Sequence, residues 1–253
     1  MEILTKTDKV FESSNNCPGC GSILGLKFLL QLIPNLKNSV LITSPGDIAL
    51  LGKSGLKVNL INSRNPVATA RGLSAARPDL NIVVYSDDEF TSMNLPSVVA
   101  ARENFLYICC NNSGFANINV KTRTKEFASL MMDNAVYSAT ASVAYYEDLI
   151  SKLTKAFSKT GFKFIDLLAP CPILWSYDSS NTIEVGRMAT ESLFWPLYEI
   201  DNKSVAITKI PPTIEQFQRF VNMLKISMPQ EELQTTQDNL NRRWRALNEG
   251  KLM

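Results

Sequence analysis

The chain has 253 residues, of which 45% are hydrophobic, and its formal net charge is +2. This size and composition support one large domain or two small ones with a full core, and the near-neutral charge gives no electrostatic reason to expect nucleic acid as a partner. No stretch approaches the roughly 18–20 apolar residues of a membrane span, and the first residues are not typical of a signal peptide. Five cysteines, an odd number, fit a reducing environment better than a disulfide framework, so we expect a cytoplasmic protein.

The sequence contains no histidine. This excludes a histidine general base, a Ser–His–Asp triad and any histidine-ligated metal within this chain. If the protein is an enzyme, its proton transfers must come from carboxylates, from a cofactor or from another subunit.

Short apolar runs alternate along the chain with segments of helical periodicity. We therefore expect a three-layer α/β fold, with a mainly parallel sheet and helices on both faces. The predicted strands are 39–43, 57–61, 82–85, 105–110 and 163–168, together with a hairpin of 197–200 and 205–208. Residues 135–144 are small and also tend to form β-structure. The predicted helices are 22–32, 92–102, 146–159, 182–192 and 213–224.

The segment after Pro229 is a polar helix with an apolar stripe. The stripe consists of Leu233, Leu240, Trp244 and Leu247. Its simplest interpretation is a docking helix for another protein surface. We accordingly predict an α/β domain over residues 1–225 and a helical docking extension over residues 226–253.

Polar residues follow two predicted strands at the centre of the chain. Asp87 ends the first, and Asn112 ends the second 25 positions later, with Gly114 close behind. Ligands of parallel sheets bind beyond the carboxyl ends of the strands, where both clusters fall. A carboxylate, an amide oxygen and a backbone carbonyl suit Mg²⁺ that holds a diphosphate, although polar strand-end loops also occur in any α/β protein.

The cysteines form two groups. Cys17 and Cys20 make a Cys-x-x-Cys turn with Pro and Gly between them, and Cys171 follows a distant strand; this pattern is open to metal binding or to dithiol redox chemistry. Cys109 and Cys110 are adjacent on one strand, so their side chains must point to opposite faces of the sheet. We expect these two to be small buried hydrophobic residues.

Residues 15–225 resemble one family in motif content and motif order. An Asp at a strand end followed by an Asn resembles the thiamin diphosphate (TPP) motif, which is usually Gly-Asp-Gly and then Asn. The wider pattern resembles the β subunit of the 2-oxoacid:ferredoxin oxidoreductases, the pyruvate and 2-oxoglutarate enzymes. The matching segments are 17–21 (Cys-Pro-Gly-Cys-Gly), 66–70 (Pro-Val-Ala-Thr-Ala), 77–80 (Arg-Pro-Asp-Leu), 111–117 (Asn-Asn-Ser-Gly-Phe-Ala-Asn) and 164–172 (Phe-Ile-Asp-Leu-Leu-Ala-Pro-Cys-Pro).

The resemblance implies a Mg²⁺–TPP site in this chain. Asp87, Asn112 and the Gly114 carbonyl would bind the Mg²⁺. Arg64 is carried over as a cofactor-binding residue from the family's His-Gly-Arg run, although residues 62–64 are Asn-Ser-Arg here. A second departure is Asp88, which stands where the family motif ends in Gly: it either points away from the diphosphate or weakens its binding.

The resemblance also implies a 4Fe–4S cluster on Cys17, Cys20 and Cys171. The family's fourth cysteine corresponds to Asp47 here, and a carboxylate oxygen is a harder, weaker donor to iron than a thiolate. A structural Zn²⁺ on three cysteines and Asp47, or an empty site, are the alternatives.

The implied activity is the TPP-dependent oxidative decarboxylation of a 2-oxoacid to acyl-CoA, with electrons leaving through the cluster to ferredoxin or flavodoxin. The implied partners are the α and γ/δ subunits of the same complex, together with the 2-oxoacid and CoA; in this family another subunit supplies the glutamate that activates the cofactor. Two alternatives remain: a non-catalytic scaffold paralogue, and a TPP enzyme without the cluster.

Overall fold

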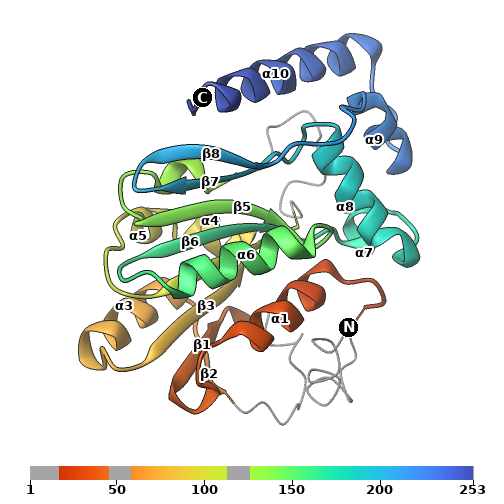
Figure 1. The fold of residues 1–253 in the computed structure, drawn as a ribbon. Coiled ribbons are helices and arrows are strands. Elements are labelled where there is room, and N and C mark those ends of the chain that lie inside the picture. Colours follow the sequence, from red (N-terminus) through yellow and green to blue (C-terminus); the bar gives the residue numbers. More distant parts are fainter. Residues whose placement is uncertain (1–16, 46–57, 113–125, 253) are drawn as a thin grey trace.

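The computed structural model describes residues 17–45, 58–112 and 126–252. Its described strands form one sheet in the order β2-β1-β3-β4-β6-β5-β7-β8, shown in Figure 1. The first six strands in this order run parallel, and β7 pairs antiparallel with both β5 and β8. The strands are β1 (Ser39–Thr43), β2 (Asn59–Asn62), β3 (Asn81–Asp87), β4 (Leu106–Asn111), β5 (Tyr137–Ser142), β6 (Lys163–Leu168), β7 (Leu197–Asp201) and β8 (Ser204–Lys209).

Helices cover both faces of the sheet, which confirms the predicted three-layer α/β fold. On one face α1 (Gly21–Leu32) and α6 (Tyr146–Phe157) pack on a core that includes Tyr85 and Cys110. On the other, α3 (Pro66–Ala76) and α5 (Leu95–Val99) pack on a core that includes Cys109. The remaining helices are α4 (Asp88–Met93), α7 (Pro172–Trp175), α8 (Thr182–Glu191), α9 (Phe217–Met223) and α10 (Gln230–Asn248), with single 3₁₀ turns η3 (Leu36–Asn38), η5 (Ser129–Met131) and η6 (Ser179–Asn181).

The strand order reverses between β1 and β3. After β1 the chain adds β2 on one side and then β3 on the other, so β1 and β3 flank a switch point of the sheet. In parallel sheets the space outside the carboxyl ends at such a point is where ligands bind. Asp87, the last residue of β3, therefore lies at the position where a ligand site is expected.

Two predicted helices differ from the structure by more than two residues at a boundary. The predicted helix 92–102 is instead α4 followed by α5, since Asp87 starts α4 early and the Asn94 side chain ends it by donating to the Phe90 carbonyl at 2.9 Å. The predicted helix from 213 begins only at Phe217. There the Glu215 amide donates to the carbonyl of Glu191 at the end of α8, which holds the preceding segment extended.

The apolar stripe of α10 packs on this chain. Leu233 is buried with Phe217 and Phe220 of α9, and Leu247 is buried against Tyr198 and Ile200 of β7. Leu240 packs partly on the same side, and Arg243 pairs with Glu126. Figure 1 shows α10 running along β8 at the edge of the sheet. The boundary at 226 and the docking role stay predictions. Most residues of the stripe, however, already pack against other residues of this chain. No helix of the described segments is long and apolar enough to cross a membrane.

We predict that Leu247→Ala lowers the free energy of unfolding by about 2–4 kcal/mol, because it removes a buried side chain from the contact between α10 and the sheet. Urea unfolding of the full chain measures this. Gln234→Ala, at an exposed position of the same helix, is the matched control and should change the free energy by less than about 0.5 kcal/mol. Equal stability of the two variants would show that α10 does not pack on the sheet in solution.

Candidate functional site

Asp87 is held in place at the carboxyl end of β3. Its carboxylate caps α4 by accepting the Phe90 amide at 2.8 Å, and its side chain is half-buried. Burial is the largest effect on its pKa and raises it, while the Phe90 amide and the hydroxyl of Ser44 beyond β1 act in the opposite direction. A half-buried carboxylate fixed between two strand ends is a suitable hard oxygen ligand for a divalent cation.

Asp88 points into the protein. Its side chain is only 2% exposed, and one carboxylate oxygen accepts the backbone amide of Asn112 at 3.4 Å. It therefore connects the residue after β3 to the residue after β4. As a result, the side chain of Asp88 lies inside the protein next to Asn112, whereas that of Asp87 is only half-buried.

Asn112 follows β4 and is held from two sides. Besides the contact with Asp88, its backbone carbonyl accepts the indole N–H of Trp175 at 2.7 Å. Trp175 is buried at the end of α7, directly after the Ala-Pro-Cys-Pro turn. The sequence analysis did not single it out; a tryptophan four residues after Cys171 was the only signal. Gly114 lies outside the described residues.

Arg64 lies in the loop between β2 and α3 and is exposed. This loop starts at the same edge of the sheet as Asp87, with only β1 between the two strands. The neighbouring Asn65 caps α3 through its side chain, which accepts the Ala68 amide at 3.0 Å. The structure therefore places Arg64 at the edge that carries the candidate site, without burying it there.

The Cys-x-x-Cys turn and the Ala-Pro-Cys-Pro turn lie directly against each other. The Gly21 amide donates to the Pro170 carbonyl at 3.1 Å, and a Cβ at position 21 would come within 2.6 Å of the Ala169 backbone. Only glycine permits this approach. Gly19, with φ +68, is anchored by the Thr182 hydroxyl, which donates to its carbonyl at 2.6 Å. Segments more than 140 residues apart in the sequence thus form one turn cluster.

The Cys20 thiol lies near the other two cysteines of these turns. Cys17 is exposed, and Cys20 and Cys171 are half-buried. Burial raises the pKa of the Cys20 thiol, Cys171 and Cys17 raise it further, and the amides of Ile23 and Ser22 lower it. Soft sulfur donors suit an iron–sulfur cluster or zinc. Within the described ranges, however, no group of three or more cysteine or acidic side chains is arranged as a metal site, and Asp47 lies outside those ranges.

Cys109 and Cys110 are both fully buried, on opposite faces of the sheet, as predicted. Cys109 lies near a second buried carboxylate, Asp166 of β6. That carboxylate accepts the Phe127 amide at 2.5 Å and the Asn111 side-chain amide at 3.1 Å. Burial raises the pKa of Asp166 well above its usual range, and Glu126 adds to the effect. Asp166 thus holds the Phe127 backbone and the Asn111 side chain in place by hydrogen bonds.

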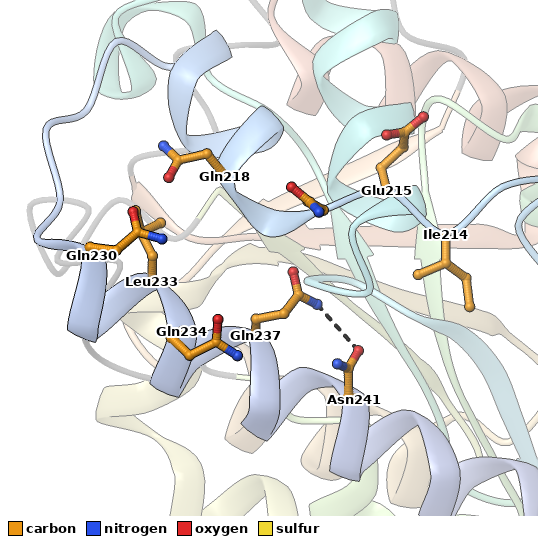
Figure 2. A pocket seen from close by; sticks show the side chains of 9 residues that line it. Ile214, Glu215, Gln218, Gln230, Leu233, Gln234, Gln237 and Asn241 are labelled. Carbon is orange, nitrogen blue, oxygen red and sulfur yellow. Dashed lines mark hydrogen bonds between the residues drawn. The ribbon is translucent and has the colours of Figure 1, made fainter.

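A separate groove of about 440 Å³ lies between α10 and the segment that leads into α9 (Figure 2). Most of the side chains that line it carry amide groups, and Leu233 lines it as well. Gln237 accepts the Phe217 amide at 2.7 Å and donates to Asn241 at 3.2 Å, so its amide already ties α10 to α9. None of the predicted site residues lines this groove. It belongs to the packing of the C-terminal helices.

The chain is similar in sequence to known subunits of 2-oxoacid oxidoreductases. It is 28% identical to the pyruvate synthase subunit PorB of Methanothermobacter thermautotrophicus, over 83% of this chain and 86% of that protein. It is 26% identical to the ketoisovalerate oxidoreductase subunit VorB of Pyrococcus abyssi, over 95% and 92%. No family model matches.

A solved structure supports the fold independently. The chain matches a 2-oxoglutarate:ferredoxin oxidoreductase from Magnetococcus marinus with a TM-score of 0.51 and 16% identity, over 88% of this chain and 91% of that one. The three-layer α/β fold is thereby confirmed. The sequence similarity to PorB and VorB confirms the resemblance to the β subunits of 2-oxoacid:ferredoxin oxidoreductases that the motifs indicated.

We predict that Asp166 makes the fold less stable as pH rises. Its pKa is higher in the folded than in the unfolded chain, so the folded state binds more protons, and stability is lost between the unfolded pKa of about 3.9 and the folded value. Asp166→Asn removes this titration. In urea unfolding at pH 5 and pH 8, the variant should gain stability relative to the natural chain as pH rises. A difference that stays constant with pH would contradict the assignment.

Proposed function

We propose that this chain is the β subunit of a 2-oxoacid:ferredoxin oxidoreductase, which converts a 2-oxoacid and CoA to acyl-CoA and CO₂ and passes the electrons to ferredoxin or flavodoxin. The observation that carries this proposal is sequence similarity to PorB and VorB subunits along nearly the whole chain. The position of Asp87 and Asn112 at the ends of adjacent central strands, and the meeting of the two cysteine turns, are consistent with it. Its partners would be the other subunits of the same complex.

The carboxyl edge of β3 and β4 would hold Mg²⁺ and TPP. Asp87, the Asn112 side chain and the Gly114 carbonyl are the proposed Mg²⁺ ligands, with Arg64 at the rim. The hydroxyls of Thr43 and Ser86 also lie at this edge and are buried without a hydrogen-bond partner among the described residues. This edge therefore offers two hydrogen-bonding groups that the described residues do not use. When bound, TPP would supply the nucleophilic carbon and the electron sink for decarboxylation. This chain's part is to anchor the diphosphate, with Asp88 and Trp175 orienting Asn112.

The cysteine turns would hold an iron–sulfur cluster through Cys17, Cys20 and Cys171, with Asp47 as the proposed fourth ligand. The cluster would take the electrons one at a time. Because the described residues alone make no complete metal site, the scaffold paralogue stays the competing function, and zinc stays the competing metal. The lack of any histidine is consistent with a catalytic base that comes from a partner subunit.

We predict that Asp87→Ala weakens Mg²⁺-dependent TPP binding to the assembled complex by at least roughly tenfold, because it removes the one charged ligand of the proposed site. Isothermal titration calorimetry measures the binding, and 2-oxoacid-dependent ferredoxin reduction measures the activity. Glu89→Ala is the control, since Glu89 is exposed on the same turn. Identical binding by the two variants would refute the Mg²⁺ assignment, and a natural complex that binds no TPP would favour the scaffold.

We predict that Cys20→Ser removes most of the iron and sulfide from the anaerobically purified chain, whereas Cys109→Ala leaves both unchanged. Cys20 lies in the turn cluster, and Cys109 is buried on the far face of the sheet. Metal analysis by plasma mass spectrometry and a sulfide assay give the result. Zinc without sulfide in the natural chain would identify a structural site instead of a cluster.

A further inference from the structure

A closed triangle of buried polar groups joins α1 to the two central strands. The Tyr85 hydroxyl donates to the Ser22 carbonyl at 2.6 Å, and the Cys110 thiol donates to the Ser22 hydroxyl at 3.0 Å. The Tyr85 oxygen and the Cys110 sulfur are themselves 3.2 Å apart. Tyr85 and Cys110 are fully buried and Ser22 is 8% exposed, so these bonds form away from water. Hydrogen bonds in such an environment are electrostatically stronger than in water.

The triangle joins the elements that carry the two candidate centres. Tyr85 comes two residues before Asp87 on β3, and Cys110 comes two residues before Asn112 on β4. Alternate residues of a strand share a face, so Tyr85 and Asp87 both face the α1 side of the sheet. The parallel register also pairs Asp87 with Cys110. Ser22, the third member, comes two residues after Cys20.

The first turn of α1 is held by these contacts as well as by the hydrogen bond from the Gly21 amide to the Pro170 carbonyl. Cys20 precedes the helix but makes no side-chain capping hydrogen bond, so the thiol itself does not lock the turn. The backbone amides of Ser22 and Ile23 nevertheless point toward the Cys20 sulfur. At Gly25, one turn further, a Cβ would come within 3.0 Å of the Tyr85 oxygen and 2.5 Å of Leu167, which shows how closely the helix approaches β3 and β6.

We propose that Tyr85 and Cys110 are positioning residues that fix the first turn of α1, and through it the Cys20 sulfur, relative to the strand ends bearing Asp87 and Asn112. The purpose of this arrangement rests on the proposed function: a redox centre on Cys20 needs a fixed distance and orientation to the diphosphate edge. Amides directed at a ligating sulfur favour the more reduced state, so their orientation sets the reduction potential of the centre. The two strands thus carry both the diphosphate ligands and the support for the cysteine turn.

The first test is hydrogen exchange on the metal-free full chain, comparing Tyr85→Phe with Tyr107→Phe. Tyr107 is the matched control, because it is fully buried on β4 and its hydroxyl lies 3.0 Å from that of Thr91 on the opposite face of the sheet. Each variant loses one buried hydroxyl. We expect amides in peptides covering residues 20–26 to exchange roughly tenfold faster in Tyr85→Phe, the factor that one net hydrogen bond represents, and to be unchanged in Tyr107→Phe. Unchanged exchange in Tyr85→Phe would overturn the proposal.

The second test is the reduction potential of the metal centre in the assembled complex, followed by electron paramagnetic resonance. We expect a shift to more negative potential in Tyr85→Phe and in Cys110→Ala, and little shift in Tyr107→Phe. Cys110→Ser keeps a donor toward Ser22 and should restore the natural potential. Equal potentials in all variants would overturn the tuning role, since a merely structural role would lower stability alone.

The two measurements separate this proposal from the proposed function. If the natural complex holds no redox centre, the proposed function fails, while hydrogen exchange still decides whether Tyr85 fixes the turn. If the centre is present and Tyr85→Phe behaves like Tyr107→Phe in both measurements, the proposed function stands and the positioning role is refuted.

Discussion

The parallel register between β3 and β4 is the constraint on which the candidate site depends. It sets Asp87 beside Cys110 and leaves Asn112 just beyond, so the polar strand ends meet at one edge. The same register assigns faces: Tyr85 and Cys110 turn toward α1, whereas Tyr107 and Cys109 turn toward α3 and α5. A slip of one residue would exchange these sets, burying Asp87 and breaking the contacts with Ser22. Packing of both faces therefore fixes the position of the polar edge.

The second constraint is the close approach of two turns that are distant in sequence. Gly21 has no room for a side chain against Ala169, and Gly25 has none against Leu167, so both turn and helix lie directly on the end of β6. This brings Cys20 and Cys171 together before any metal is considered. A metal would then stabilise an arrangement that backbone packing already favours, instead of having to create it.

Much of the fold could be predicted from the sequence, because its central strands are continuous apolar runs that only a sheet buried on both faces explains. The opposite placement of Cys109 and Cys110 followed from strand geometry alone. Helix limits were less predictable where a side chain decides them, as Asn94 does at the end of α4. The proximity of Cys20 to Cys171 came from family resemblance, since no local pattern links positions 150 residues apart. The role of Trp175 could not be predicted, because it consists of one hydrogen bond to a backbone carbonyl that is distant in sequence.

At position 88 this chain has aspartate where the motif has glycine, and the two residues act differently on the local structure. A glycine there lets the backbone turn without side-chain contacts, whereas Asp88 begins α4, where a carboxylate is favoured by the helix dipole. Its side chain then reaches the amide of Asn112 and connects the ends of β3 and β4. The carboxyl group of Asp88 thus lies inside the protein, beside the backbone of Asn112. Because the aspartate adds a contact that orders Asn112, its presence does not by itself count against the proposed diphosphate site at this edge.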